Sequence, residues 1–90
     1  MFIIFAHVKP QSNSKLFKKC GGAYVNIWID YKDISGSFFL AEKYLTKGKW
    51  NVFRMKKNYK LFESLKGLSV EEKGYYKEAK KFGYSMVFHM

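Results

Sequence analysis

Two histidines are the residues of this sequence best suited to proton transfer near neutral pH. His7 lies in the apolar segment FIIFAHVK, and His89 lies in the segment YSMVFHM. If both segments are strands of one sheet, the two imidazoles could sit on adjacent strands and act as acid and base in RNA cleavage. The alternative is two ordinary strand histidines. A small RNA-cleaving toxin is therefore a third functional hypothesis, after the two described below.

Other catalytic or metal-binding patterns are missing from the sequence. Cys20 lies next to Lys18 and Lys19, which would favour the thiolate of an exposed cysteine, but no base or orienting group accompanies it. Asp30 and Asp33 are three residues apart, which points them to opposite faces of a strand and argues against a metal pair. The sequence thus predicts no catalytic residue, no metal and no cofactor, and it favours a protein that is not an enzyme.

Positive charge and aromatic rings dominate the composition. The 90-residue chain has a formal net charge of +10 and an aromatic content of 20%. Such charge attracts phosphates. However, Arg54 is the single arginine among 17 basic residues, and specific base or phosphate recognition favours the planar fork of arginine. Part of the lysine content is also expected from an AT-rich genome.

A basic cluster precedes a glycine pair in the segment SKLFKKCGG. Lys15, Lys18 and Lys19 are candidates for contacting phosphate groups, with Gly21 and Gly22 beside them. The segment lacks the Lys-Ser/Thr ending of a P-loop. The alternative is a solvated connection between two strands, with one helical turn over 15–19.

Apolar patterns predict the strands that would position these residues. The predicted strands are 2–9, 22–31, 50–56 and 84–90. Residues 59–65 form a further returning strand or a loop. Pro10 ends the first strand.

Two segments change to the helical period. Residues 36–47 form a helix that Ser35 or Ser37 caps and that ends before Gly48. In residues 68–83, Ser69 and Glu72 have the spacing of a capping box, and Gly83 suits the position after the helix end. The predicted buried face of this second helix consists of Tyr75, Tyr76, Ala79 and Phe82.

This order of elements predicts one α+β domain over residues 1–90. The expected fold is ferredoxin-like, βαββαβ with an extra N-terminal strand, and has a four- or five-stranded sheet. Right-handed crossovers would place both helices on one face of the sheet and leave the other face, called the outer face below, uncovered.

Strand alternation assigns side chains to the two faces of the sheet. Residues predicted to face the helices are Ile4, Ala6, Val8, Val25, Ile27, Ile29 and Tyr31. The predicted binding surface on the outer face comprises Phe5, His7, Tyr24, Trp28, Arg54, Lys56, Lys60 and Phe62. Further outward candidates are Ile3, Asn26, Asp30, Val52, Val87 and His89.

Two functions fit this aromatic and basic surface. The first is a protein-interaction module, most simply a homodimer formed through the outer face or through the exposed C-terminal strand, or a complex with another protein. The alternative is a domain that binds single-stranded RNA or DNA, with rings stacking on bases and lysines neutralising phosphates. The scarcity of arginine favours the first.

The expected location is the cytoplasm, with no membrane partner. A single cysteine excludes an internal disulfide framework. The apolar N-terminal run lacks the basic flank and cleavage site of a signal peptide, and it is too short to span a bilayer.

Overall fold

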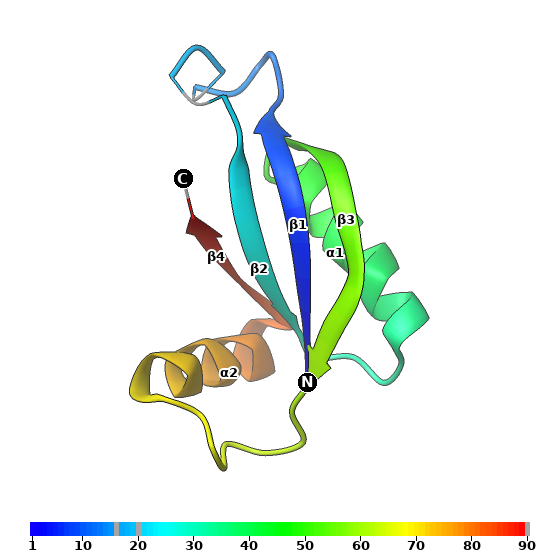
Figure 1. The fold of residues 1–90 in the computed structure, drawn as a ribbon, viewed down its shortest axis with the longest axis vertical. Helices are drawn as coiled ribbons and strands as arrows, with labels where there is room; N and C mark the ends of the chain where they lie inside the picture. The colour runs from blue at the N-terminus through cyan, green and yellow to red at the C-terminus, as the bar shows by residue number, and fades with distance from the viewer. Residues whose placement is uncertain (16, 20, 90) are drawn as a thin grey trace.

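The structure, a computed structural model, describes residues 1–15, 17–19 and 21–89, which form one sheet and two helices (Figure 1). The elements are β1 (Phe2–Pro10), β2 (Ala23–Ile29), α1 (Ile34–Lys47), β3 (Trp50–Leu61), α2 (Val70–Phe82) and β4 (Tyr84–His89). The protein is therefore α+β, as predicted.

The sheet has four strands in the order β3-β1-β2-β4, and every neighbouring pair is antiparallel. The β1–β2 hairpin lies in the centre, so β3 and β4 form the two edges (Figure 1). No separate strand exists at 59–65 among the described residues, because β3 continues without a turn to Leu61. The four-stranded alternative is correct, but this strand order does not establish a ferredoxin-like arrangement.

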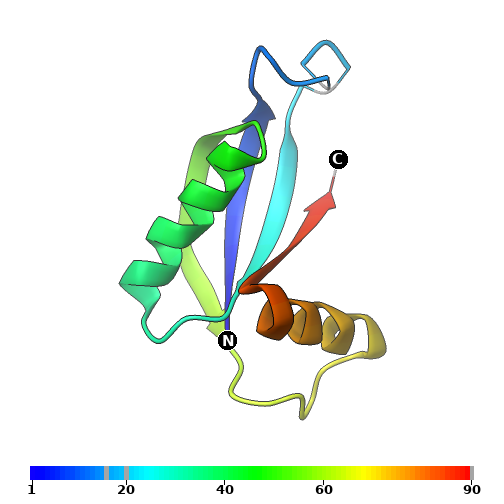
Figure 2. The same cartoon turned by 180° about the vertical axis from the view of Figure 1, so that it is seen from behind.

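The two helices lie on opposite faces of the sheet (Figures 1 and 2). On the inner face, Ala41 and Leu45 of α1 are fully buried in the cluster that contains Ile27. On the outer face, α2 packs against Trp28 and Ile3. The prediction that both helices share one face was wrong.

The directions of the strands allow α2 to lie on the outer face. Strands β2 and β3 run in the same direction, so α1 is a crossover to which the right-handed rule applies. Strands β3 and β4 run in opposite directions and lie at opposite edges of the sheet. The handedness rule does not constrain that connection, and the apolar side chains on both faces of β2 allow a second layer.

The start of α1 differs from the prediction. Asp33 is the N-cap, and its Oδ1 accepts a hydrogen bond of 2.7 Å from the backbone N–H of Gly36. The buried Ser37 hydroxyl donates to the Asp33 carbonyl at 2.7 Å instead of capping the helix. The helix consequently begins at Ile34 rather than at 36, and Gly48 follows its last residue as predicted.

The capping box of α2 is confirmed. The backbone N–H of Glu72 donates to Ser69 Oγ at 3.2 Å, and the backbone N–H of Ser69 donates to Glu72 Oε1 at 3.0 Å. Gly83 ends the helix in the left-handed region at φ 92°. Tyr76 and Ala79 are buried as predicted, whereas Phe82 is 63% exposed.

Strand β3 does not alternate regularly. Its register against β1 shifts twice, between Ile4 and Ala6 and again between His7 and Val8. The second shift pairs Val8 with Val52, which therefore packs on the inner cluster and not on the predicted outer face. Bulges of this kind change which side of the sheet each following side chain takes.

Candidate functional site

One row of outer-face residues crosses all four strands. Arg54 of β3 pairs with His7 of β1, His7 pairs with Tyr24 of β2, and Tyr24 pairs with His89 of β4. Directly opposite residues in an antiparallel pair have side chains on the same face. The sheet thus places a guanidinium, two imidazoles and a phenol ring side by side.

Three rings of this region form what we call the His7 cluster: His7, Tyr24 and Phe53. The imidazole stacks on Tyr24 with ring centroids 4.6 Å apart and contacts Phe53 edge-on at 5.3 Å. His7 is half-buried between its neighbours, whereas Tyr24 is 55% and Phe53 is 63% exposed. The two exposed rings are therefore available for contact with another molecule.

Two lysines lie over the exposed rings. The Nζ atom of Lys9 is 4.6 Å from the centroid of Phe53, and that of Lys56 is 6.0 Å from the centroid of Tyr24. These distances fall within the range of cation–π attraction. These lysines therefore place positive charge next to the exposed rings of Phe53 and Tyr24.

A cavity of about 370 Å³ adjoins the His7 cluster, since Lys9 and Phe53 belong to its lining together with Phe17 of the β1–β2 connection. The same connection carries Lys15, Lys18 and Lys19, and all three side chains are exposed. Their prediction as phosphate contacts is not tested by the structure, but they extend the basic surface beyond the strands.

Helix α2 bounds the uncovered part of the outer face (Figure 1). It covers Trp28, which is 3% exposed and stacks on Phe62 with centroids 5.9 Å apart. Tyr75 of α2 contacts the same indole at 6.1 Å. Trp28 is therefore buried beneath α2 and does not lie on the uncovered surface as predicted, whereas Phe62 is half-buried against the same cluster.

A second cavity, of about 180 Å³, lies between α2 and the uncovered strands. Its polar lining comprises Asn26, Lys60, Glu71, Glu72 and His89, and Phe5 is among its apolar residues. Hydrogen bonds with the backbone N–H and the side chain of Ser69 lower the pKa of the Glu72 carboxyl below its ordinary value. This side chain therefore stays ionised near neutral pH.

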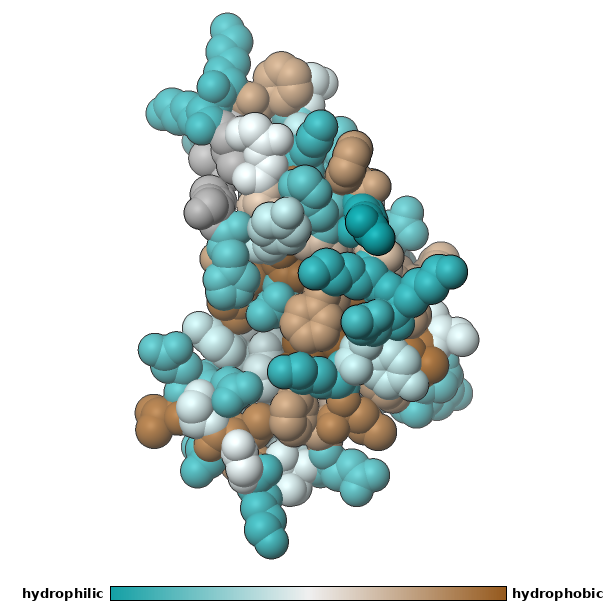
Figure 3. All heavy atoms as spheres, in the orientation of Figure 1, coloured by the Kyte–Doolittle hydropathy of each residue, from teal (hydrophilic) through white to brown (hydrophobic). Residues whose placement is uncertain are grey.

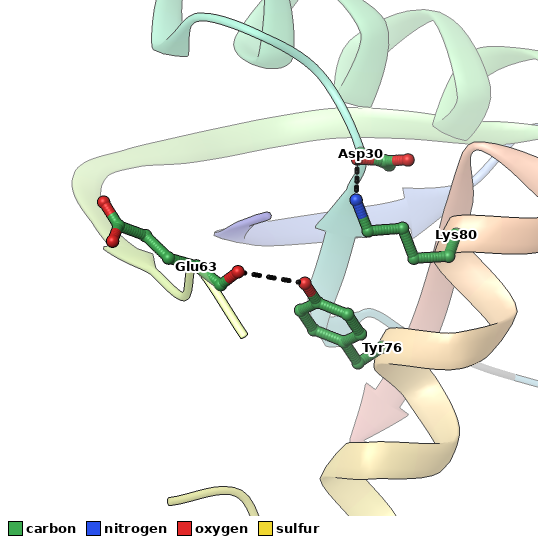
Figure 4. Close-up of polar contacts among 4 residues, drawn as sticks. All are labelled: Asp30, Glu63, Tyr76 and Lys80. Carbon is green, nitrogen blue, oxygen red and sulfur yellow. Dashed lines mark hydrogen bonds and ion pairs between the residues drawn. The ribbon is translucent and has the colours of Figure 1, made fainter. Parts of the chain in front are cut away.

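Charge is segregated between the sheet and the helices. None of the seven acidic residues lies in residues 1–29, 43–62 or 84–89, so the strands carry no carboxylate side chain. Asp30 pairs with Lys80 of α2 at 3.3 Å, and the backbone carbonyl of Glu63 accepts a hydrogen bond from Tyr76 (Figure 4). Figure 3 shows hydrophilic side chains projecting among apolar ones over the strands of the outer face.

The structure brings together most of the predicted binding residues. Phe5, His7, Tyr24, Arg54, Lys56 and Lys60 lie on or border the uncovered part of the outer face. His7 and His89 share this face but are not on adjacent strands, because β2 lies between them. The prediction that His7 and His89 could lie on adjacent strands as an acid–base pair was therefore wrong.

Sequence reasoning missed two members of the site. The alternation of β1 already places Lys9 on the same side as His7 and could have identified it. Phe53 could not be found in this way, because the bulge in β3 determines its side.

Cys20 lies outside the described residues. Asp33 serves as a helix cap, and Asp30 forms an ion pair.

Within the described residues, no group of three or more His, Cys, Asp or Glu side chains could hold a metal ion. None of the helices described is both long and apolar enough to cross a membrane. No protein-family model, curated protein or solved structure matches this chain.

Proposed function

We propose that the uncovered part of the outer face binds single-stranded nucleic acid. The observation that supports this proposal most directly is the His7 cluster, with two exposed rings, a lysine over each of them and no carboxylate on any strand. Stacking rings combined with a cationic surface are the two requirements for binding unpaired nucleotides.

The rings would contact bases, and the cations would contact phosphates. His7 occupies one face of Tyr24, so a base would stack on the other face, on the side of β4 where His89 is paired with Tyr24. Phe53 offers a second exposed ring. A base must leave its own stack to reach either ring, and single strands permit this at lower cost than duplexes.

Self-association through the same surface is less favourable. A two-fold dimer uses the same patch of both subunits, so it would bring two copies of Lys9, Arg54 and Lys56 together. Juxtaposed like charges oppose such an interface. The lysine-rich surface is therefore better suited to a polyanion than to a second copy of itself.

The test is fluorescence anisotropy with a labelled oligonucleotide, single-stranded or annealed to its complement. Tyr24→Ala and Phe53→Ala should each weaken single-strand binding about 5- to 150-fold, which corresponds to about 1–3 kcal/mol per stacked base. The matched control is Phe39→Ala, because Phe39 is 69% exposed on α1, across the sheet. It should bind as the unmodified chain does.

A net charge of +10 will retain any nucleic acid at low salt, so binding alone does not support the proposal. Equal affinity for single strand and duplex, together with unchanged binding by Tyr24→Ala, would contradict it. The attraction would then come only from the lysines.

A further inference from the structure

The two edges of the sheet differ in their protection against pairing with another strand. Edge strand β3 carries four cationic residues and two register shifts, features that discourage edge-to-edge pairing. Edge strand β4 has no Lys, Arg, Asp, Glu or Pro, and its register against β2 is regular over its whole length. Within the described residues, β4 pairs only with β2.

Apolar side chains flank the free edge of β4. Tyr84, Met86 and Phe88 are half-buried on the inner face. Tyr84 stacks on Tyr44 of α1 with ring centroids 4.0 Å apart, and Phe88 stacks on Trp50 at 4.9 Å. The row is therefore held in place by α1 and the start of β3 while part of its surface still contacts solvent.

A hollow of about 420 Å³ lies beside the same edge. It is lined by Glu78 and Phe82 of α2 and by Tyr84, Ser85 and Met86 of β4. Phe82 is 63% exposed there, although the helical pattern predicted it to be buried. A strand added to β4 would cover this ring and fill the hollow.

We propose that β4 pairs antiparallel with β4 of a second copy of this chain. Residues opposite each other in such a pair must point to the same face, so Met86 can lie opposite Met86 of the second copy. In that register Tyr84 lies opposite Phe88 of the second copy, and the reverse pair is equivalent by symmetry. Two aromatic pairs then join the inner faces.

The charge distribution explains why a second copy fits at this edge rather than elsewhere. Two chains of charge +10 repel each other and must meet where positive charge is lowest. Strand β4 carries no Lys, Arg, Asp or Glu, and the neighbouring α2 contains Glu71, Glu72 and Glu78 beside its four lysines. Of the two sheet edges that the structure describes, β4 is the one that combines low charge with partly uncovered apolar side chains.

The dimer would have a specific geometry. The two-fold axis of an antiparallel strand pair is perpendicular to the sheet, so both outer faces lie on the same side of one continuous sheet. Each His7 cluster stays uncovered, because its cations and rings lie on β1, β2 and β3. If the proposed function is correct, one nucleic-acid strand could then contact both copies.

The experiment is analytical ultracentrifugation of the full chain without nucleic acid, over a micromolar concentration series. The unmodified chain should sediment as a dimer that dissociates on dilution. Met86→Lys places two like charges at the two-fold axis and should give a monomer with an unchanged circular dichroism spectrum. Phe39→Lys, which adds the same charge on α1, should remain dimeric.

Crosslinking gives a result that does not depend on the stability of the lysine variant. In a Cys20→Ser background, a short bismaleimide should link Met86→Cys to itself and should leave Phe39→Cys unlinked. A chain that is monomeric throughout the series, a folded Met86→Lys dimer, or Met86→Cys and Phe39→Cys reacting alike would each overturn the proposal. Because no nucleic acid is present, these outcomes are independent of the proposed binding function.

Discussion

The imidazole of His7 and the phenol ring of Tyr24 lie side by side on neighbouring strands, with their planes 18° apart and their centroids separated by 4.6 Å. A ring held from one side loses less conformational entropy when a third ring stacks on its other side. If the proposed function is correct, we expect His7 to act by positioning Tyr24 and not by contacting the ligand itself.

Replacement of His7 should distinguish positioning from charge. His7→Ala should weaken single-strand binding by less than Tyr24→Ala does, because Tyr24 remains but is no longer held. His7→Phe keeps a ring beside Tyr24 and should retain most of the affinity. Anisotropy titrations of the three variants decide this, and a His7→Phe affinity as low as that of His7→Ala would exclude a positioning role for the ring.

Lysines in the β1–β2 connection should act through charge alone. Replacing Lys18 and Lys19 together with Ala should reduce affinity for all sequences. The slope of log K against log salt should become shallower by about 0.7 for each phosphate of a single strand that the variant no longer neutralises. Tyr24→Ala should leave this slope unchanged. A double lysine variant with the parent slope would show that this connection does not bind phosphates.

The sequence predicted the central hairpin well because its alternation is regular. Every predicted inward residue of β1 and β2, from Ile4 to Ile29, lies in the inner cluster. The capping box at Ser69 was also found, since it depends on local hydrogen bonds and not on tertiary packing.

The predictions that were wrong concern features that depend on interactions between distant parts of the chain. The side taken by α2 depends on which sheet edge it connects, and that order is not encoded in a single segment. The bulge beside His7 moved Val52 inward, although alternation predicted it to point outward. Trp28 did offer a signal in advance, because a large apolar ring opposite Ile27 and Ile29 on a strand indicates a second covering layer.

Trp28 should be essential for stability and not for binding alone. Trp28→Ala removes a side chain that is 3% exposed beneath α2, and such truncations cost about 3–5 kcal/mol. In a small domain this is a large part of the total stability. Urea denaturation should show a much lower midpoint, whereas Phe53→Ala, at 63% exposure, should change it little. Similar midpoints would mean that α2 does not cover the indole.

The capping box should make helix α2 sensitive to acid. Hydrogen bonds from Ser69 lower the Glu72 pKa in the folded chain below the ordinary value of 4.5. Its contribution is therefore fully present above that value and is lost as the pH falls through the lower folded pKa. Ser69→Ala should cost about 1 kcal/mol at neutral pH and reduce this acid dependence.

Thermal melts from neutral to acidic pH will test the cap. Glu71→Gln is the matched control, because Glu71 is also in the first turn of α2 but takes no part in the capping box. It should keep the acid dependence of the unmodified chain. A Ser69→Ala variant that keeps the melting temperature of the unmodified chain at neutral pH would contradict the assignment.

One substitution should have opposite effects at two glycines. Gly74 lies inside α2, and a Cβ atom there would meet nothing within 4 Å, so Gly74→Ala should stabilise the chain by about 0.5–1 kcal/mol. Gly83 has φ 92°, where an alanine is strained by about 1–2 kcal/mol. Melting temperatures should move in opposite directions. A rise for both variants would show that Gly83 does not keep this backbone conformation, and a fall for both would contradict the expectation for Gly74.

The opposite placement of the helices has a spectroscopic consequence. The chain has two tryptophans, and the sheet separates them: Trp50 belongs to the inner cluster under α1, and Trp28 to the outer cluster under α2. Indole emission depends on contact with water, so each layer carries its own fluorophore. Fluorescence from chains that keep one tryptophan can therefore follow the loss of each helix separately, and it can show whether the two halves of the core come apart in one step.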